Sequence, residues 1–136
     1  MEKWKLIEPE IGDHIRVKSK QLYHHGIYIG NDEVIQFGGP FDMFTNPKDI
    51  VVEKVNIEDF LKGGFLEVRV LDRKERKQKR NVDEIIKTAL SKLGEGGYDI
   101  LYNNCEHFVN YCIFGVKKSI QVDDLHKEIR EKLGKK

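Results

Sequence analysis

The side chain best suited to nucleophilic chemistry lies in residues 103–112, Asn-Asn-Cys-Glu-His-Phe-Val-Asn-Tyr-Cys, where a helix is expected to begin. Asn103 or Asn104 can cap the free backbone N–H groups of a first helical turn. A thiol in that turn feels the positive end of the helix dipole, which favours the thiolate. Cys105 is therefore a candidate nucleophile, although buried cysteines are common and mostly inert. Helical spacing places five residues on one inward face: Cys105, Phe108, Val109, Cys112 and Ile113.

A cysteine nucleophile needs an imidazole base within hydrogen-bond reach, and the chain has five histidines. Three of them are poorly placed to serve as that base. His14 opens a strand as a surface residue, His107 points away from the helix face that carries the cysteine, and His126 belongs to a polar tail. His24 and His25 are adjacent at the start of a strong strand, and alternation places them on opposite faces of a sheet. The residues alone leave two possibilities open: one of the pair meets the cysteine helix, or both form a surface pair at a strand end.

The composition indicates one folded domain that needs no disulfide or metal. The chain has 136 residues, of which 39% are hydrophobic and 35% charged, with a net charge of +1. This size can bury a proper core, and so small a net charge gives no global field that favours nucleic acid. Cys105 and Cys112 are too far apart on one helix to bridge each other. No cluster has zinc-ligand spacing, so we expect neither metal nor cofactor.

The expected location is cytoplasmic. No apolar run approaches the length that spans a bilayer, and residues 1–10 lack the apolar core of a secretion signal. One basic concentration stands out at residues 72–80. Such charge runs are usually solvated connectors, and the alternative is attraction to anionic lipid or another polyanion.

The elements that must position these side chains are strands in the first half and helices in the second. A Gly-Asn-Asp loop at 30–32 predicts a hairpin, 57–61 suits a single helical turn, and Asn81 caps a helix that ends at Gly94. This order predicts an α+β fold in which helices pack on an antiparallel sheet. Strands are expected at residues 15–17, 25–29, 34–37, 50–55 and 65–71.

Three stretches together resemble one known family. They are His-His-Gly-Ile-Tyr-Ile-Gly at 24–30, Val-Ile-Gln-Phe at 34–37, and N-C-E-H-F-V-N-Y-C-x-x-G-V-x-x-S-x-Q-V at 104–122. The chain resembles the lecithin:retinol acyltransferase (LRAT-like) family, which includes the small phospholipase A/acyltransferases. That resemblance covers about His14 to Val122 and implies a circularly permuted papain-like (NlpC-type) fold. It further implies a single domain over 1–136, with a core of about 10–122 and a charged tail at 123–136.

The resemblance also implies roles for individual residues. The family's nucleophile corresponds to Cys105, and its catalytic histidine, six residues before the glycine that closes its strand, corresponds to His24. His25 then takes a position usually held by an aromatic or other residue. The third polar position, usually histidine, is Gln36, whose amide oxygen can orient His24 but cannot share charge as an imidazole would. At the start of the helix, the Cys105 backbone N–H is the natural oxyanion donor.

The implied activity is that of a thiol acyltransferase or phospholipase-type hydrolase. Either one forms a thioester acyl-enzyme from an acyl ester, for which phospholipid is the favoured substrate. From the charged residues 123–136 we expect no C-terminal apolar anchor of the kind that many such proteins carry. Contact with a membrane surface would therefore use the basic stretch 73–80 or the loop 38–45, which holds Phe41, Met43 and Phe44. Two alternatives stay open: a papain-like amidase or isopeptidase, and a non-enzymatic module that retains the site.

Overall fold

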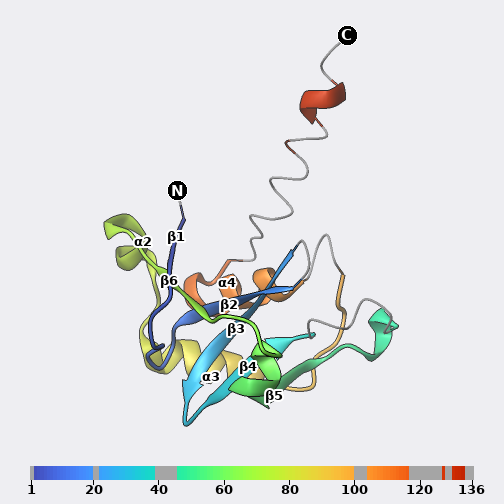
Figure 1. The fold of residues 1–136 in the computed structure, drawn as a ribbon, viewed down its shortest axis with the longest axis horizontal. Helices are drawn as coiled ribbons and strands as arrows, with labels where there is room; N and C mark the ends of the chain where they lie inside the picture. The colour runs from blue at the N-terminus through green and yellow to red at the C-terminus, as the bar shows by residue number, and fades with distance from the viewer. Residues whose placement is uncertain are drawn as a thin grey trace.

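A six-stranded sheet organises the chain, with its strands in the order β1-β6-β2-β3-β4-β5 (Figure 1). Every neighbouring pair is antiparallel, and helices pack on the sheet, which confirms the α+β prediction. The circular permutation of a papain-like fold stays a prediction. The computed structural model describes residues 2–19, 22–38, 46–99, 104–116, 127 and 130–133.

The element bounds follow the sequence expectations closely. The strands are β1 (Lys3–Lys5), β2 (His14–Ser19), β3 (Leu22–Gly30), β4 (Glu33–Phe37), β5 (Val52–Asn56) and β6 (Glu67–Val70). The helices are α1 (Ile57–Leu61), α2 (Arg73–Gln78), α3 (Val82–Ser91) and α4 (Cys105–Phe114), with a 3-10 turn at Pro47–Asp49. The predicted single turn and the Asn81-capped helix are confirmed as α1 and α3.

Two elements differ from expectation. The edge strand β1 was not predicted, because three residues are too few to show a periodic pattern. The basic run, expected to be a connector, instead forms α2, because Asp72 and Glu75 make a reciprocal capping box at its start. The loop 38–45 beyond Gly38, Asn103 and most of the tail 123–136 lie outside the described residues.

A tight turn sets the register that brings the polar residues of β3 and β4 together. Asn31 and Asp32 have φ of 52° and 57°, a left-handed conformation that short polar side chains tolerate better than most. The hairpin that results pairs Gly26 with Gln36, and β5 continues the row by pairing Gln36 with Glu53. Directly paired residues share a sheet face, so Gln36 and Glu53 point to the same side.

Helices lie on both faces of the sheet (Figure 1), and each face carries a hydrophobic core. Helices α3 and α4 pack on the face that includes Ile27, Ile35 and Phe37. Helix α1 covers the other face, where Phe60 is fully buried against residues such as Val34. Burial of each such side chain contributes about 1.5–3 kcal/mol relative to exposure. Alternation along β3 therefore decides which core each histidine joins.

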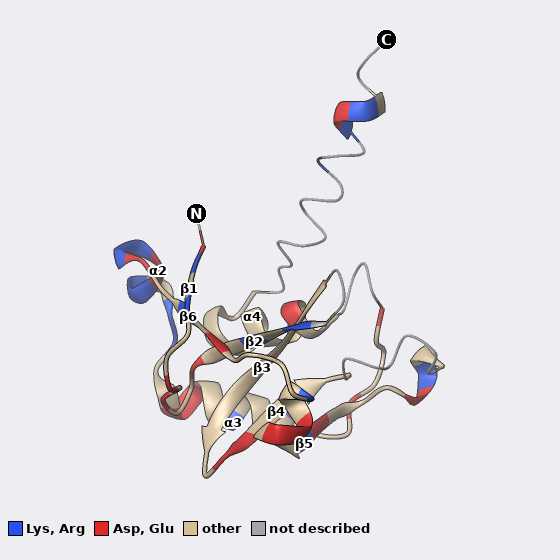
Figure 2. Cartoon of the chain, viewed as in Figure 1, with Lys and Arg blue, Asp and Glu red and all other residues tan. Residues whose placement is uncertain are grey.

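Within the parts of the chain that the structure describes, no helix is both long enough and apolar enough to cross a membrane. The basic side chains of α2 lie at one side of the molecule (Figure 2). Arg80, just after α2, donates its backbone N–H to the carbonyl of Ile113 near the C-terminal end of α4. Because Cys105 starts α4, the basic segment lies at the opposite end of that helix from the thiol.

Candidate active site

Asn104 builds the helix start that carries the candidate nucleophile. Its Oδ1 accepts the backbone N–H groups of Glu106 (2.9 Å) and His107 (3.1 Å). In return, His107 Nδ1 accepts the N–H of Asn104 at 3.0 Å. This reciprocal cap resembles a capping box in which histidine replaces the usual glutamate or glutamine. Sequence reasoning missed this role of His107, whose signal is its position three residues after the cap.

The Cys105 thiol lies beside the peptide bond that joins His24 and His25. The N–H of that peptide belongs to His25, and it hydrogen bonds to the thiol. The β3–β4 pairs begin only at Gly26 and Gln36. Strand β4 therefore leaves space beside the His25 N–H, where the thiol can lie. A strand's N–H lies in the plane of the sheet, whereas side chains leave it on both faces. The thiol thus meets β3 at its edge, with His24 on one face and His25 on the other.

Burial controls the acidity of this thiol. Cys105 is 7% exposed, and all five residues of the predicted inward face are buried. Burial raises the pKa of Cys105 to about 11, and the Glu106 carboxylate raises it further, while the backbone N–H groups of His25, Glu106 and Cys105 lower it. The expected gain in thiolate from the helix dipole is therefore outweighed. At neutral pH this cysteine is a thiol and needs a base to become a nucleophile.

On the α1 face, His24 sits in a polar and aromatic setting. Its Nε2 hydrogen bonds to Gln36 Oε1 at 2.9 Å, and its ring lies 4.9 Å from that of Phe60, centroid to centroid. Gln36 in turn donates from Nε2 to Glu53 Oε1 at 2.9 Å. The structure thus brings together the two residues predicted as base and orienter, and it adds Glu53. Their catalytic roles stay predictions.

Gly26 makes the contact between Phe60 and His24 possible. A Cβ at this glycine would lie 2.7 Å from Phe60 Cε1 and 2.7 Å from Val34 Cγ1, closer than atoms can pack. Phe60 comes from α1, whose start is capped by Asn56. A glycine two residues after the histidine therefore allows an aromatic ring to hold the imidazole from one side.

On the α4 face, His25 belongs to a closed cluster that sequence reasoning missed. His25 Nδ1 and His14 Nε2 are 2.7 Å apart, and His25 Nε2 is 4.0 Å from Glu106 Oε2. Trp4 packs edge-on against both imidazoles. His14 is 3% exposed, so its expected surface position is wrong: β1 and β6 extend the sheet and cover it. Burial lowers the pKa values of His14 and His25 well below the usual value.

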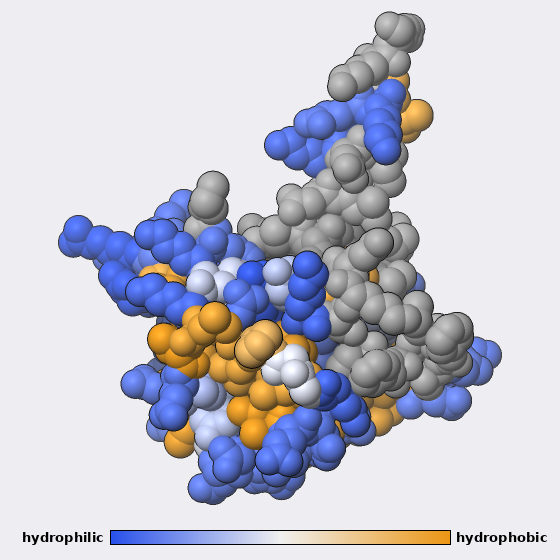
Figure 3. All heavy atoms as spheres, in the orientation of Figure 1, coloured by the Kyte–Doolittle hydropathy of each residue, from blue (hydrophilic) through white to orange (hydrophobic). Residues whose placement is uncertain are grey.

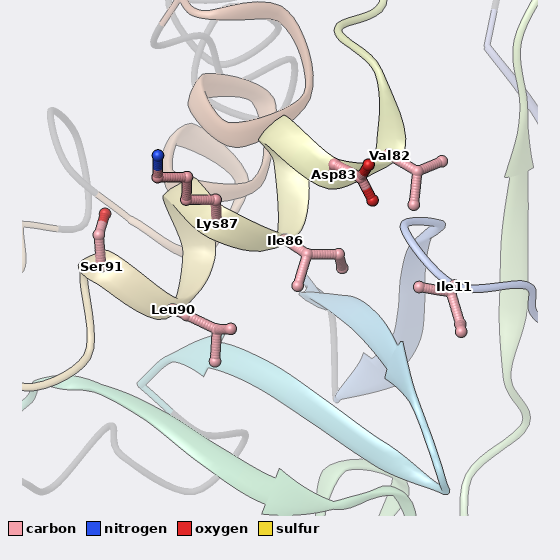
Figure 4. Close-up of a pocket in the computed structure, with 7 residues that line it drawn as sticks. All are labelled: Ile11, Val82, Asp83, Ile86, Lys87, Leu90 and Ser91. Atoms are coloured by element: carbon pink, nitrogen blue, oxygen red, sulfur yellow. The ribbon is translucent and has the colours of Figure 1, made fainter.

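The hollow shown in Figure 4 lies elsewhere on the molecule. It lies along α3, and its apolar part is formed by Ile11, Val82, Ile86 and Leu90. The rest of its lining consists of Asp83, Lys87 and Ser91. In Figure 4, the side chains of Ile86 and Leu90 point toward the strands, and that of Lys87 points away from them. The thiol of Cys105 is not part of this hollow. The chemistry that the residues at β3 support is nucleophilic attack by a thiol with imidazole assistance.

Comparisons with known proteins agree with this geometry. Residues 7–118 match the family model described as "Lecithin retinol acyltransferase". Lecithin retinol acyltransferase from Bos taurus is 31% identical over 88% of this chain and 60% of the relative. The human protein of the same name is 33% identical over 82% of this chain and 57% of the relative. The chain thus spans about 60% of the length of these curated relatives.

A second group of relatives matches over more of its own length. Human "Phospholipase A and acyltransferase 4" is 30% identical over 90% of this chain and 80% of the relative. Mouse "Phospholipase A and acyltransferase 3" is 29% identical over 90% and 81%. Because the family model covers most of the chain and the second group matches almost throughout, the chain belongs to the lecithin retinol acyltransferase family.

Proposed function

We propose that this chain is a thiol acyltransferase or phospholipase-type hydrolase that acts on acyl esters, phospholipids above all. One observation carries the proposal. In a member of the lecithin retinol acyltransferase family, a capped helix holds the Cys105 thiol beside the peptide that joins His24 and His25. The relatives are named for acyl transfer and phospholipase A activity, and a thiol nucleophile with an imidazole base suits both reactions.

The proposed reaction has two steps. His24 removes the Cys105 proton as the sulfur attacks the ester carbonyl carbon, because a thiol of pKa about 11 is protonated at neutral pH. The carbonyl oxygen gains negative charge, and the Cys105 N–H is the proposed donor to it. Collapse expels the alcohol with the proton from His24 and leaves a thioester. Water or an acyl acceptor then attacks the thioester, and the thiol regains its proton.

The cap supports the proposed oxyanion donor. The Asn104 side chain accepts hydrogen bonds from the backbone N–H groups of Glu106 and His107. The Asn104 carbonyl accepts one from the N–H of Phe108. The Cys105 N–H instead interacts with its own thiol, whose pKa it lowers. A donor beside the sulfur is also beside the carbon that the sulfur attacks, which is what oxyanion stabilisation requires.

Apolar side chains at the same end of the sheet support access to lipid. Leu22, two residues before His24, is 52% exposed, and Phe65 is 83% exposed. The neighbour of Phe65, Gly64, lies against Val17, which pairs with His24. Hydrophobic residues also gather on one face of the molecule (Figure 3). Peripheral contact with a membrane surface at this end is part of the proposal, since exposed apolar groups favour such contact.

The test is the intact mass of the protein after brief exposure to phospholipids and short acyl esters. We expect an acyl-sized gain that Cys105→Ala abolishes and Cys112→Ala, the matched control, retains. The acyl length would identify the donor class. If the esters give no adduct but amide or peptide substrates acylate Cys105, the proposal is replaced by an amidase or isopeptidase. No adduct with any substrate would replace it with a non-enzymatic role.

A further inference from the structure

Glu53 extends the row of polar residues that begins at His24. It lies on β5 directly opposite Gln36, and its Oε1 accepts a hydrogen bond from Gln36 Nε2 at 2.9 Å. Gln36 is 4% exposed, whereas Glu53 is exposed. The three side chains therefore form a path from the buried imidazole to the protein surface along one sheet face.

The carboxylate decides which way the Gln36 amide points. The two ends of an amide are nearly equal in size, but one only accepts and the other only donates. A carboxylate accepts only, so the NH₂ end of Gln36 faces Glu53 and the oxygen faces His24. An amide without such a partner can present either end to an imidazole. The recorded orientation of Gln36 thus depends on Glu53 as well as on His24.

The amide orientation in turn selects the imidazole tautomer. Because Gln36 Oε1 only accepts, His24 Nε2 must carry a proton and donate it at 2.9 Å. The neutral ring then has its lone pair on Nδ1, the nitrogen that can take a proton from a thiol. When His24 becomes imidazolium, the same Nε2–H bond persists. The carboxylate beyond it favours that positive charge.

We propose that Glu53 is a positioning residue: by orienting the Gln36 amide, it holds His24 in the Nε2–H tautomer that leaves Nδ1 as the base. This inference rests on the proposed function of His24. It also gives a reason why glutamine serves at position 36, where the resembled family usually has histidine. A glutamine with a fixed amide can hold the imidazole as well as a second ring could.

The first test measures the tautomer itself. The ¹⁵N–¹H correlation spectrum of His24 distinguishes protonated from unprotonated ring nitrogens and needs no turnover. We expect a single Nε2–H tautomer in the unaltered protein and in the control Glu33→Gln, a carboxylate on β4 that pairs instead with Lys54. In Glu53→Leu we expect a mixture of tautomers. An unchanged single tautomer in Glu53→Leu would overturn the proposal.

The second test measures catalysis. Glu53→Leu should lower kcat by about 10-fold or more, the order expected when a catalytic group is misplaced, and leave KM nearly unchanged. Because the imidazolium loses its distant carboxylate, the acidic limb of the pH–rate profile should move to lower pH. The kcat of Glu53→Gln should lie between those of the unaltered protein and Glu53→Leu, since the amide oxygen of the new glutamine can still accept a hydrogen bond from Gln36. Equal kcat and equal pH profiles in all variants would contradict the inference.

A double variant separates positioning from simple damage. In a Gln36→His background no amide remains to be oriented, so Glu53→Leu should cost several-fold less than in the parent. An equal loss in both backgrounds would overturn the proposal. If the acyl-enzyme test fails while His24 keeps one tautomer that depends on Glu53, the proposed function fails and the positioning role stands.

Discussion

His24 and His25 are neighbours in the chain but belong to two different regions of the molecule. On the α1 face, His24 contacts Gln36, which leads to the exposed carboxylate of Glu53. On the α4 face, His25 contacts His14 within a cluster whose two imidazoles are at most 3% exposed. The same residue type therefore has an outward polar path on one face and a closed environment on the other.

The difference supports His24, rather than His25, as the proposed base. A general base must become charged and neutral again in each cycle. Burial lowers the pKa of His25 well below its usual value, and the neighbouring charges of His24, Arg16 and Arg69 lower it further. The row from His24 to Glu53 ends in a carboxylate that favours a positive imidazole. The environments of the two rings, an outward polar row for His24 and a buried cluster for His25, therefore distinguish the two histidines.

The largest expected effect on activity comes from substituting His24 and His25 in separate variants. His24→Gln should lower kcat/KM by about 10²–10⁴-fold, the usual contribution of a general base, with little change in unfolding free energy. His25→Phe should keep most of the activity and lose about 1–3 kcal/mol of stability, because His14 loses its buried partner. Steady-state kinetics and urea unfolding measure both. The opposite pattern would identify His25 as the base.

The second effect concerns the Cys105 thiol at the boundary of the two faces. Its pKa is raised from 9.0 to about 11, so at neutral pH it holds roughly 100-fold less thiolate than an unperturbed cysteine. Alkylation by iodoacetamide should therefore be slow at pH 7 and rise about tenfold per pH unit up to pH 10. Mass spectrometry in a Cys112→Ala background follows it. A plateau below pH 8 would instead show a thiolate–imidazolium pair already present in the free protein.

The third effect is a loss of stability in acid, and it should arise mainly from the cluster of His14 and His25 on the α4 face. His14 and His25 have lowered pKa values when folded, and about 6.5 when unfolded. Below pH 6.5 these two histidines bind protons in the unfolded chain but stay neutral in the folded chain. Stability is thus full above pH 6.5 and falls with acid, by up to about 1.4 kcal/mol per pH unit for each histidine.

Urea midpoints between pH 7.5 and 5 measure this slope. The double variant His14→Gln/His25→Phe should show a much flatter dependence, whatever its stability at pH 7.5. A slope that does not change in the double variant would place the acid-sensitive groups elsewhere.

Local signals explain what sequence reasoning predicted correctly. Asn104 before an apolar face predicted α4 and its buried cysteine, and a short polar loop predicted the β3–β4 hairpin. Both features depend on residues close in the chain. The contact between His24 and Gln36 was likewise expected, from the resemblance rather than from physics.

Features that depend on distant pairing were missed. The burial of His14 requires an edge strand that brings Trp4 from the N-terminus, and the contact of Glu53 requires the β4–β5 register. The raised pKa of Cys105 could not be predicted, because the helix dipole is a local property and burial is not. Sequence reasoning therefore predicted the local elements that carry these side chains, and it missed the environment that distant pairing creates around them.

The smallest expected effect tests how the α1 face holds His24. Gly26→Ala places a methyl group 2.7 Å from Phe60 and from Val34, so we expect a loss of about 1–3 kcal/mol from overpacking. Gly96→Ala is the matched control, since a Cβ there meets only a carbonyl at 3.7 Å. Urea unfolding should separate the two variants clearly.

The same substitution links packing to chemistry. If Phe60 holds the His24 ring, Gly26→Ala should also lower kcat, and Phe60→Leu should relieve part of the overpacking in the double variant. The closed face provides the comparison, because the contacts of His25 with His14 and Trp4 lie on the other side of the strand. The acid slope of stability should therefore not change in Gly26→Ala. A changed slope with unchanged kcat would mean that the methyl group disturbs the His25 side, and that Phe60 does not position the base.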